Sequence, residues 1–304
     1  MTTITTRLIG GLGNQMFQYA AARAQALRRG AQVRLDLSSF EDQLPGNTPR
    51  HYELDKYPVA ATIADPIAGK ASIEQADPTL LVRLGRLVGL QRPAAGAGNG
   101  LAVTPYREPH FRFDPKLAQQ PLPLLMDGYW QSERYFKDAA EYIRTELTPT
   151  APLEPDNAAT FAAIVKVEAV SVHIRRGDYV ANAQTNAYHG TCSLDYYSQA
   201  IEFVRSRVER PHLFVFSDDP DWTRANLVAD LPTTYVSANL SDRGYRDMQL
   251  MSCCRHHIIA NSSFSWWGAW LNPEPAKIVV APARWFAKPG TDTSDLVPKE
   301  WNRI

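Results

Sequence analysis

The chain has 304 residues, 44% of them hydrophobic and 21% charged, which describes an ordinary globular protein. This length exceeds what one small core needs and favours two α/β domains. The 32 basic and 32 acidic side chains cancel, which excludes a global field that would hold a nucleic acid. No apolar run approaches the roughly 20 residues of a membrane-spanning helix, so no span is expected.

The N-terminus and the cysteines indicate the compartment. The chain does not open with a charged segment followed by a long apolar one, so no secretory signal is expected. Cys192, Cys253 and Cys254 fit neither a disulfide framework nor zinc spacing. We therefore expect a cytoplasmic protein.

The first recognisable unit is a strand, a glycine-rich loop, a helix and a second strand. Residues 4–9 precede Gly10-Gly11-Leu12-Gly13-Asn14-Gln15, a helical period runs to Gly30, and residues 33–37 form the next strand. This order is similar to the opening of a nucleotide-binding fold. Gly-x-Gly alone also suits any tight strand-to-helix turn. The amides of Asn14 and Gln15 favour a site that meets a phosphate or a sugar hydroxyl.

A second stretch, residues 122–136, combines a buried strand with aromatic and polar residues. The strand runs into Asp127-Gly128 and is followed by a helix that Ser132 would cap. Tyr129 and Trp130 suit the core, or with Gln131 a wall on which a sugar ring stacks; we expect one aromatic in each role. The stretches His51–Leu54 and Pro105–Asp114 are rich in aromatic and polar residues and are assigned to no element.

The second half alternates strands and helices, after a proline-rich linker at residues 148–158. Strands are predicted near residues 170–174, 213–216, 235–236, 257–260 and 277–281. Such alternation predicts a parallel sheet with right-handed crossovers. Polar clusters follow three of these strands, and in an open α/β sheet the carboxyl ends of the strands form the ligand-binding edge. The clusters are residues 173–178, 217–219 and 261–265.

The chemistry of the three clusters suits a guanosine diphosphate derivative. Ser262, Ser263 and Ser265, with the free amides of a helix start, would cradle a diphosphate, and Arg175 or Arg176 would neutralise it. Asp218 or Asp219 would accept the paired N–H groups of a guanine edge. The alternatives are local: the serines serve only as N-caps, and one aspartate caps the following helix.

Five motifs together resemble the bacterial α-1,2-fucosyltransferases of glycosyltransferase family 11. They are Gly10–Ala20 (GGLGNQMFQYA), Gly128–Phe136 (GYWQSERYF), His173–Tyr179 (HIRRGDY), Phe216–Trp222 (FSDDPDW) and Asn261–Leu271 (NSSFSWWGAWL). Their order and spacing agree with the family pattern. Residues 60–102 match nothing in it, which leaves the acceptor preference open.

The resemblance implies a GT-B architecture: an α/β protein of two Rossmann-like domains whose parallel sheets face a cleft. Residues 1–150 would form the acceptor side and residues 151–304 the donor side, with the last residues packing back on the first domain. It further implies an inverting enzyme that moves L-fucose from GDP-β-L-fucose to the 2-hydroxyl of a terminal galactose in an oligosaccharide, such as an O-antigen. Neither a metal nor another cofactor is expected.

The resemblance also assigns roles to residues. Arg175 would contact the β-phosphate and stabilise the departing GDP, Asp218 and His173 would lie near the guanine, and residues 11–15 would face the donor. Gly11, Gly13, Asn14 and Gln15 are the residues meant in that loop. The diphosphate would be lined by Ser262, Ser263, Phe264 and Ser265.

Several alternatives stay open. The general base would be Asp178 or His173, although a role for Asp178 in orienting the arginines is slightly favoured. A nicotinamide-dependent oxidoreductase would use Gly11, Gly13 and Asp36. A sugar-binding module would use Trp130, Trp266 and Trp267, and another linkage, such as α-1,6, is the alternative within the transferases. Trp285, Phe286 and Lys288 would form either a peripheral membrane contact or, as we favour, part of the core.

Overall fold

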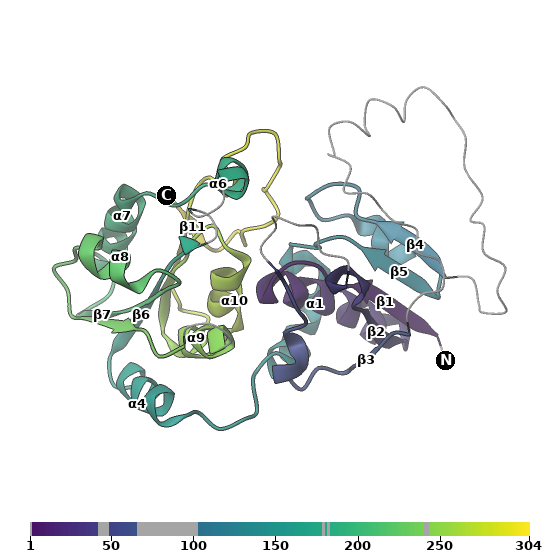
Figure 1. The fold of residues 1–304 in the computed structure, drawn as a ribbon, viewed down its shortest axis with the longest axis horizontal. Coiled ribbons are helices and arrows are strands. Elements are labelled where there is room, and N and C mark those ends of the chain that lie inside the picture. The colour runs from purple at the N-terminus through teal and green to yellow at the C-terminus, as the bar shows by residue number, and fades with distance from the viewer. Residues whose placement is uncertain (1, 42–48, 66–102, 178–179, 181–182, 240–242) are drawn as a thin grey trace.

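The computed structural model describes residues 2–41, 49–65, 103–177, 180, 183–239 and 243–304. These residues form two sheets, with strand orders β3-β2-β1-β5-β4 and β11-β10-β9-β6-β7-β8. Every strand pairing in the described part of the chain is parallel. Figure 1 shows the second sheet on the left, the first on the right, and α1 and α10 side by side between them. The predicted α/β fold with two Rossmann-like parallel sheets is confirmed.

The first sheet is built by the N-terminal half of the chain. Its elements are β1 (Thr3–Arg7), α1 (Leu12–Arg29), β2 (Gln32–Asp36), β3 (Ala61–Ile63), β4 (Thr104–Arg107) and β5 (Leu124–Asp127). Short 3-10 turns and one helix connect or follow them: η1 (Ser38–Phe40), η2 (Leu54–Lys56), η3 (Pro115–Gln119), η4 (Glu133–Tyr135), η5 (Lys137–Ala139) and α3 (Ala140–Glu146).

The helix predicted after Ser132 is instead two 3-10 turns, which corrects that prediction. Ser132 does cap the first of them, since its Oγ accepts a hydrogen bond from the Arg134 amide at 3.4 Å. The run is broken at Phe136, whose φ of −142° and ψ of 7° lie outside the helical region. The Phe136 ring is fully buried and stacks on Trp267 with 5.4 Å between centroids, so packing overrides the local helical signal.

The C-terminal half builds the second sheet. Its elements are α4 (Pro155–Ile164), β6 (Glu168–Ile174), α6 (Ala183–His189), α7 (Leu194–Arg205), β7 (Pro211–Ser217), α8 (Pro220–Asn226), β8 (Thr233–Val236), α9 (Gly244–Cys253), β9 (His256–Ile258), α10 (Ser263–Leu271), β10 (Val279–Ala281) and β11 (Asn302–Arg303). The central strand β6 is buried along nearly its whole length, as expected where helices cover both faces of a parallel sheet.

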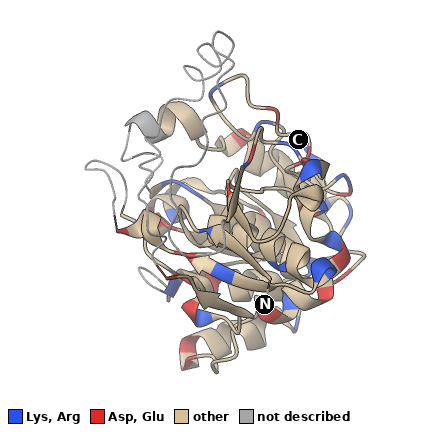
Figure 2. Cartoon of the chain, turned by 90° about the vertical axis from the view of Figure 1, so that its right-hand side faces the viewer, with Lys and Arg blue, Asp and Glu red and all other residues tan. Residues whose placement is uncertain are grey.

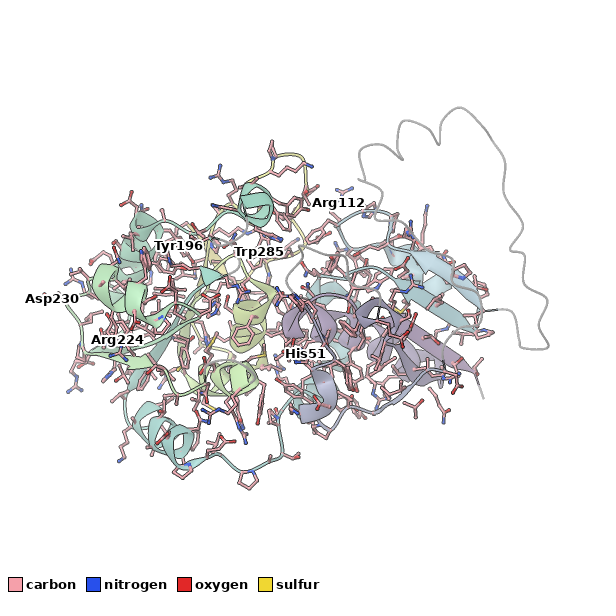
Figure 3. All side chains as sticks on the ribbon, in the orientation of Figure 1. His51, Arg112, Tyr196, Arg224, Asp230 and Trp285 are labelled. Carbon is pink, nitrogen blue, oxygen red and sulfur yellow. The ribbon has the colours of Figure 1, made fainter. Side chains whose placement is uncertain are left out.

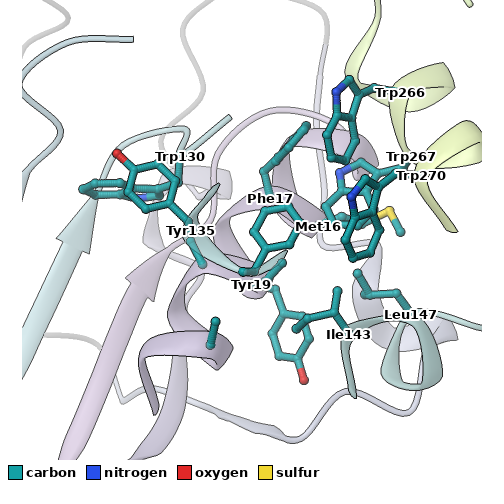
Figure 4. Close-up of a cluster of buried hydrophobic side chains, with 14 of the residues drawn as sticks. Met16, Phe17, Tyr19, Trp130, Tyr135, Ile143, Leu147, Trp266, Trp267 and Trp270 are labelled. Carbon is teal, nitrogen blue, oxygen red and sulfur yellow. The ribbon is translucent and has the colours of Figure 1, made fainter. Parts of the chain in front are cut away.

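The largest core is shared between the two halves. Helix α10 carries three tryptophans, and the Trp266 ring lies 4.4 Å from that of Phe17 on α1 and 5.4 Å from that of Trp301 near the C-terminus. Figure 4 shows Trp266, Trp267 and Trp270 gathered in one cluster with Met16, Phe17 and Leu147. Trp130, Trp266 and Trp267 are fully buried, so the alternative of a sugar-binding module on these three rings is wrong.

Polar contacts also join the halves. Arg246 on α9 is almost fully buried and donates to the carbonyls of Ala151 and Pro152 at 3.1 and 2.6 Å and to Glu154. Near the C-terminus, Asp295 accepts a hydrogen bond from Arg134 at 2.9 Å. The linker is thus held by α9 of the C-terminal half, and the last residues are tied to the N-terminal half.

The surface gives no sign of one dominant charge. Figure 2 shows Lys and Arg interspersed with Asp and Glu over the side that it presents. Trp285 and Phe286 are 5% and 8% exposed, so the favoured role in core packing is confirmed for these rings. In Figure 3, Trp285 lies toward the junction of the halves, whereas Arg224 and Asp230 lie on the far side of the second sheet. No helix among the described residues is long and apolar enough to cross a membrane.

Candidate functional site

Two helix N-termini meet at the carboxyl ends of the two sheets. A Cβ added to Gly13 of α1 would lie 2.6 Å from the backbone carbon of Ser263 and 2.7 Å from the Phe264 nitrogen, so only glycine allows this approach. The Trp267 indole donates to the Gly13 carbonyl at 2.9 Å and fixes the contact. The positive ends of two helix dipoles therefore converge, which suits a bound anion.

The two arginines after β6 have different partners. Arg175 pairs with Asp218 at 2.9 Å between Nη1 and Oδ2. Arg176 pairs with Asp219 at 3.2 Å, and its guanidinium lies 3.5 Å from the centre of the Trp222 ring. Trp222 lies on α8, so Arg176 is held against that helix, and Arg175 is the better candidate for the ligand.

The two aspartates after β7 also divide their roles. Asp219 caps α8 by accepting a hydrogen bond from the Trp222 amide at 3.3 Å, which confirms that one aspartate of the pair is a helix cap. Asp218 accepts from the Arg176 amide at 2.8 Å as well as from Arg175, so both its oxygens are engaged. In this structure Asp218 orients the arginine loop. Asp178 lies outside the described residues.

The three serines of α10 are not equivalent. The Ser262 hydroxyl caps the helix at the Phe264 amide, at 3.3 Å, and the buried Ser265 hydroxyl donates to the carbonyls of Ala260 and Ser262. The N-cap alternative therefore holds for Ser262, and Ser265 serves the same local structure. No hydrogen bond between described residues occupies the Ser263 hydroxyl, which lies against Gly13. Ser263 and the helix amides are the groups suited to a diphosphate.

His173 lies under Phe264 and is nearly buried, with 5.4 Å between the ring centroids. Burial, with a contribution from the Arg175 charge, lowers the pKa of His173 to about 3. The ring is therefore neutral at physiological pH, and its low basicity makes it a poor general base. Its buried Nδ1 has no hydrogen-bond partner among the described residues, so it can meet a donor of a ligand.

On the N-terminal side, the predicted glutamines Gln131 and Gln15 make hydrogen bonds within the first half of the chain. Gln131 donates to the Asn14 side chain at 2.7 Å, which ties the aromatic turn to the start of α1. Gln15 is fully buried and binds the backbone of Gly10, His51 and Glu53, so its amide anchors that loop and does not face a ligand.

The two aromatics after Gly128 take different positions, as expected. Trp130 is fully buried and belongs to the core, where its ring stacks on Tyr106 at 6.3 Å. Tyr129 is 40% exposed and stays the candidate for a sugar contact.

Two carboxylates at this junction were missed by the sequence analysis. Glu53 caps α1 by accepting from the Leu12 amide at 3.1 Å, and burial raises the pKa of its carboxyl. Glu108 accepts from the amides of Tyr129 and Trp130 at 2.7 and 3.1 Å. Glu53 and Glu108 lie in the two stretches, His51–Leu54 and Pro105–Asp114, that the sequence analysis left unassigned. The sequence signal for β4 is weak. Tyr106 is partly buried between exposed neighbours, as in a strand, but Pro105 obscures this alternation.

No group of three or more His, Cys, Asp or Glu residues that could hold a metal ion occurs among the residues that the structure places. The dinucleotide hypothesis loses its ribose ligand, because Asp36 pairs with Arg7 at 3.2 Å. The structure thus has the GT-B arrangement of two Rossmann-like parallel sheets, with the Arg175–Asp218 pair and the contact between the starts of α1 and α10 in the loops that follow their strands.

The comparisons agree with this class. The sequence model of glycosyl transferase family 11 matches residues 114–304. The chain is 34% identical to alpha-1,2-colitosyltransferase of Escherichia coli, over 100% of this chain and 99% of that protein. It is 35% identical to the O-antigen biosynthesis glycosyltransferase WbnK of Escherichia coli, over 97% and 98%. A bovine (Bos taurus) galactoside 2-alpha-L-fucosyltransferase, SEC1, is 31% identical over 34% of this chain and 28% of its own length.

The chain belongs to glycosyltransferase family 11. The family resemblance drawn from the five motifs is thereby confirmed, and nothing supports the alternative of a nicotinamide-dependent oxidoreductase.

Proposed function

We propose that this protein transfers L-fucose from GDP-β-L-fucose to the 2-hydroxyl of a terminal galactose, with inversion at the anomeric carbon. The observation that carries the proposal is Arg175, which Asp218 holds at 2.9 Å in the loop after β6, the strand that pairs with β9 just before α10. The sugar and the linkage are supported by the likeness to a galactoside 2-alpha-L-fucosyltransferase and to an alpha-1,2-colitosyltransferase.

The main demand of such a reaction is the charge that develops on the departing GDP. A deoxy sugar forms an oxocarbenium-like centre readily, so stabilising the leaving diphosphate lowers the barrier most. Arg175 supplies a fixed positive charge, and the amides of α10 with the Ser263 hydroxyl supply hydrogen bonds. Because these groups neutralise the diphosphate, we expect transfer without a divalent metal.

The remaining site residues are assigned by their position. The guanine would lie beside His173 and Phe264, where the unpartnered Nδ1 of His173 meets a donor of the base. The acceptor galactose would enter from the first sheet and contact Tyr129 and Gln131, with Asn14 holding Gln131 in place.

GDP-colitose is a second candidate donor, favoured by the 34% identity to a colitosyltransferase along the whole chain. Colitose lacks one hydroxyl of fucose. A site that binds this hydroxyl prefers fucose strongly, whereas a site that merely has room for it discriminates weakly.

The test is an incubation of the purified protein with EDTA, GDP-fucose and lactose, with GDP release and the product linkage followed by NMR. We expect 2'-fucosyllactose, and a parallel reaction with GDP-colitose gives the donor preference as a ratio of kcat/KM values. A product with another linkage contradicts the regiochemistry. If no product forms and calorimetry detects no GDP binding, the donor site itself is wrong.

A further inference from the structure

The turn from Gly128 to Trp130 is held in an unusual backbone conformation by Glu108. Trp130 has a φ of 55°, which non-glycine residues seldom adopt. The Glu108 carboxylate accepts the amides of Tyr129 and Trp130, at 2.7 and 3.1 Å. A Cβ on Gly128 would lie 2.4 Å from the Glu108 Cβ, so the backbone passes directly against this side chain. Backbone strain of this kind concentrates at functional sites, and here it fixes the orientation of one carboxylate.

This turn leads directly to the donor side of the junction. The residue after Trp130 is Gln131, which donates to Asn14 at 2.7 Å in the first turn of α1. Asn14 follows Gly13, which touches Ser263 of α10. Glu108 therefore stands on the acceptor half, connected by short contacts to the helix ends proposed to hold the diphosphate.

The charged neighbours of Glu108 do not neutralise it. Within the described ranges no ion pair involves Glu108. Asp127 raises its proton affinity, and the other titratable groups that face it are the phenols of Tyr129 and Tyr135. Burial raises the pKa of Glu108 to about 7, although the two amides oppose this shift. Near neutral pH the carboxyl can therefore both accept and hold a proton, as a general base requires.

The other acid–base candidates among the described residues of the site are less suited to accept a proton. Asp218 and Asp219 pair with arginines. Glu53 caps α1, and although burial raises the pKa of its carboxyl, the nearby charges of His51 and Arg50 oppose this shift. His173 is too weak a base, for the reason given above.

We propose that Glu108 is the general base that activates the acceptor hydroxyl, an inference that rests on the proposed function. The acceptor O–H bond breaks and its proton passes to a Glu108 oxygen. The acceptor oxygen bonds to the anomeric carbon, and the bond from this carbon to the β-phosphate oxygen breaks, its electron pair leaving with GDP. Glu108 then releases the proton to water.

The test compares Glu108→Gln with the wild type across pH 5 to 9. The amide is isosteric and keeps one acceptor for the turn, but it cannot take a proton. We expect kcat for transfer to fall about 100-fold or more, because general bases contribute 10²–10⁴. The wild-type rate should fall below about pH 7, and the variant should lose this acid limb. GDP affinity, measured by calorimetry, should stay within about twofold, since the leaving-group site is untouched.

Two further variants keep the result interpretable. Glu53→Gln removes the other carboxylate with a raised pKa at this junction and should retain the acid limb, whatever its rate. Glu108→Asp retains a carboxylate set back by one methylene, so slower transfer with the acid limb preserved is expected; it also serves if Glu108→Gln does not fold.

Transfer by Glu108→Gln within about threefold of the wild type, or an unchanged acid limb, would overturn the proposal. A loss of GDP affinity equal to the loss of rate would also overturn it, since it would mean that Glu108 only supports the fold. If the wild type itself forms no fucoside, the proposed function is wrong. This outcome is distinguishable from a failure of the Glu108 proposal, because the wild type is assayed before the variants.

Discussion

Arginines and aspartates stand at the carboxyl ends of the strands in both sheets. In the second sheet they come one residue later relative to the end of the strand than in the first. In the first sheet Arg7, Asp36, Arg107 and Asp127 are the last residues of their strands, and they pair across the edge at 3.1 to 3.5 Å. In the second sheet Arg175 and Asp218 come one residue after their strands end and pair in the loops, at 2.9 Å.

Both sets of charges are ion-paired, but the offset places them differently relative to the strand register. A strand-end residue faces its register partner on the neighbouring strand, so its charge is cancelled within the sheet. A residue one position later follows the last register pair of its strand, at the carboxyl edge of the sheet. Glu108 occupies this later position in the first sheet, directly after Arg107. The second sheet thus presents a cation suited to a diphosphate, and the first presents a carboxyl and an aromatic ring suited to a neutral sugar.

The largest effect is expected from Arg175→Ala. Loss of this charge should cost about 2 to 4 kcal/mol of transition-state binding, by analogy with the loss of an oxyanion donor. This corresponds to a roughly 30- to 1,000-fold lower kcat at saturating donor. The rate of GDP formation measures it.

Arg176→Ala is the matched control for this prediction. Its guanidinium is held by Asp219 and the Trp222 ring, so we expect a lower melting temperature and a kcat within about tenfold of the wild type. Equal losses of kcat in the two variants would break the distinction between the arginines.

Gly13→Ala tests the contact that brings the two edges together. The new methyl group meets backbone atoms at 2.6 to 2.7 Å, which cannot move aside as a side chain could. Overpacking of this kind should lower the free energy of unfolding by about 1 to 3 kcal/mol. GDP affinity should fall with it, because the two helix ends separate. Denaturant unfolding and calorimetry measure the two effects.

Gly244→Ala provides a glycine control near the same helix. A Cβ there lies 3.9 Å from the Phe264 ring, an ordinary contact, so neither stability nor GDP affinity should fall. Wild-type stability in Gly13→Ala would mean that α1 and α10 move apart freely.

The smallest effect is expected from Tyr129→Ala. Removing this 40% exposed ring should raise KM for the acceptor about 2- to 12-fold, the equivalent of 0.5–1.5 kcal/mol for one aromatic contact. KM for GDP-fucose should not change. Tyr142→Ala on α3 removes a more exposed ring, at 58%, and should alter neither constant. If only KM for GDP-fucose changes, Tyr129 contacts the donor and the assignment to the acceptor is wrong.

The long and regular elements could be predicted from the sequence, because their periods are clear. Five of the six strands of the second sheet, β6 to β10, and the polar residues after them follow from alternation and topology. Three strands were missed: β3, β4 and β11 have only three, four and two residues and lack a buried apolar run. Missing β4 hid Glu108, because no edge position could be assigned to it.

The division of labour within the motifs could not be predicted. Arg175 and Arg176 are neighbours in the chain, and only the ring of Trp222 and the carboxylate of Asp219, 43 residues away, separate their roles. The same holds for Ser265, whose hydroxyl binds carbonyls of its own helix start. Such assignments depend on rotamers and distant partners, which a linear pattern does not contain.

The core shared by α1 and α10 has a practical consequence for engineering. A chimera that takes its acceptor half from a relative, with the exchange made at residue 150, would set the α10 tryptophans against foreign side chains at the sites of Phe17 and Phe136. Grafts that carry α10 and the segment ending at Trp301 together with the new half preserve these contacts. The natural unit of exchange is therefore discontinuous along the chain.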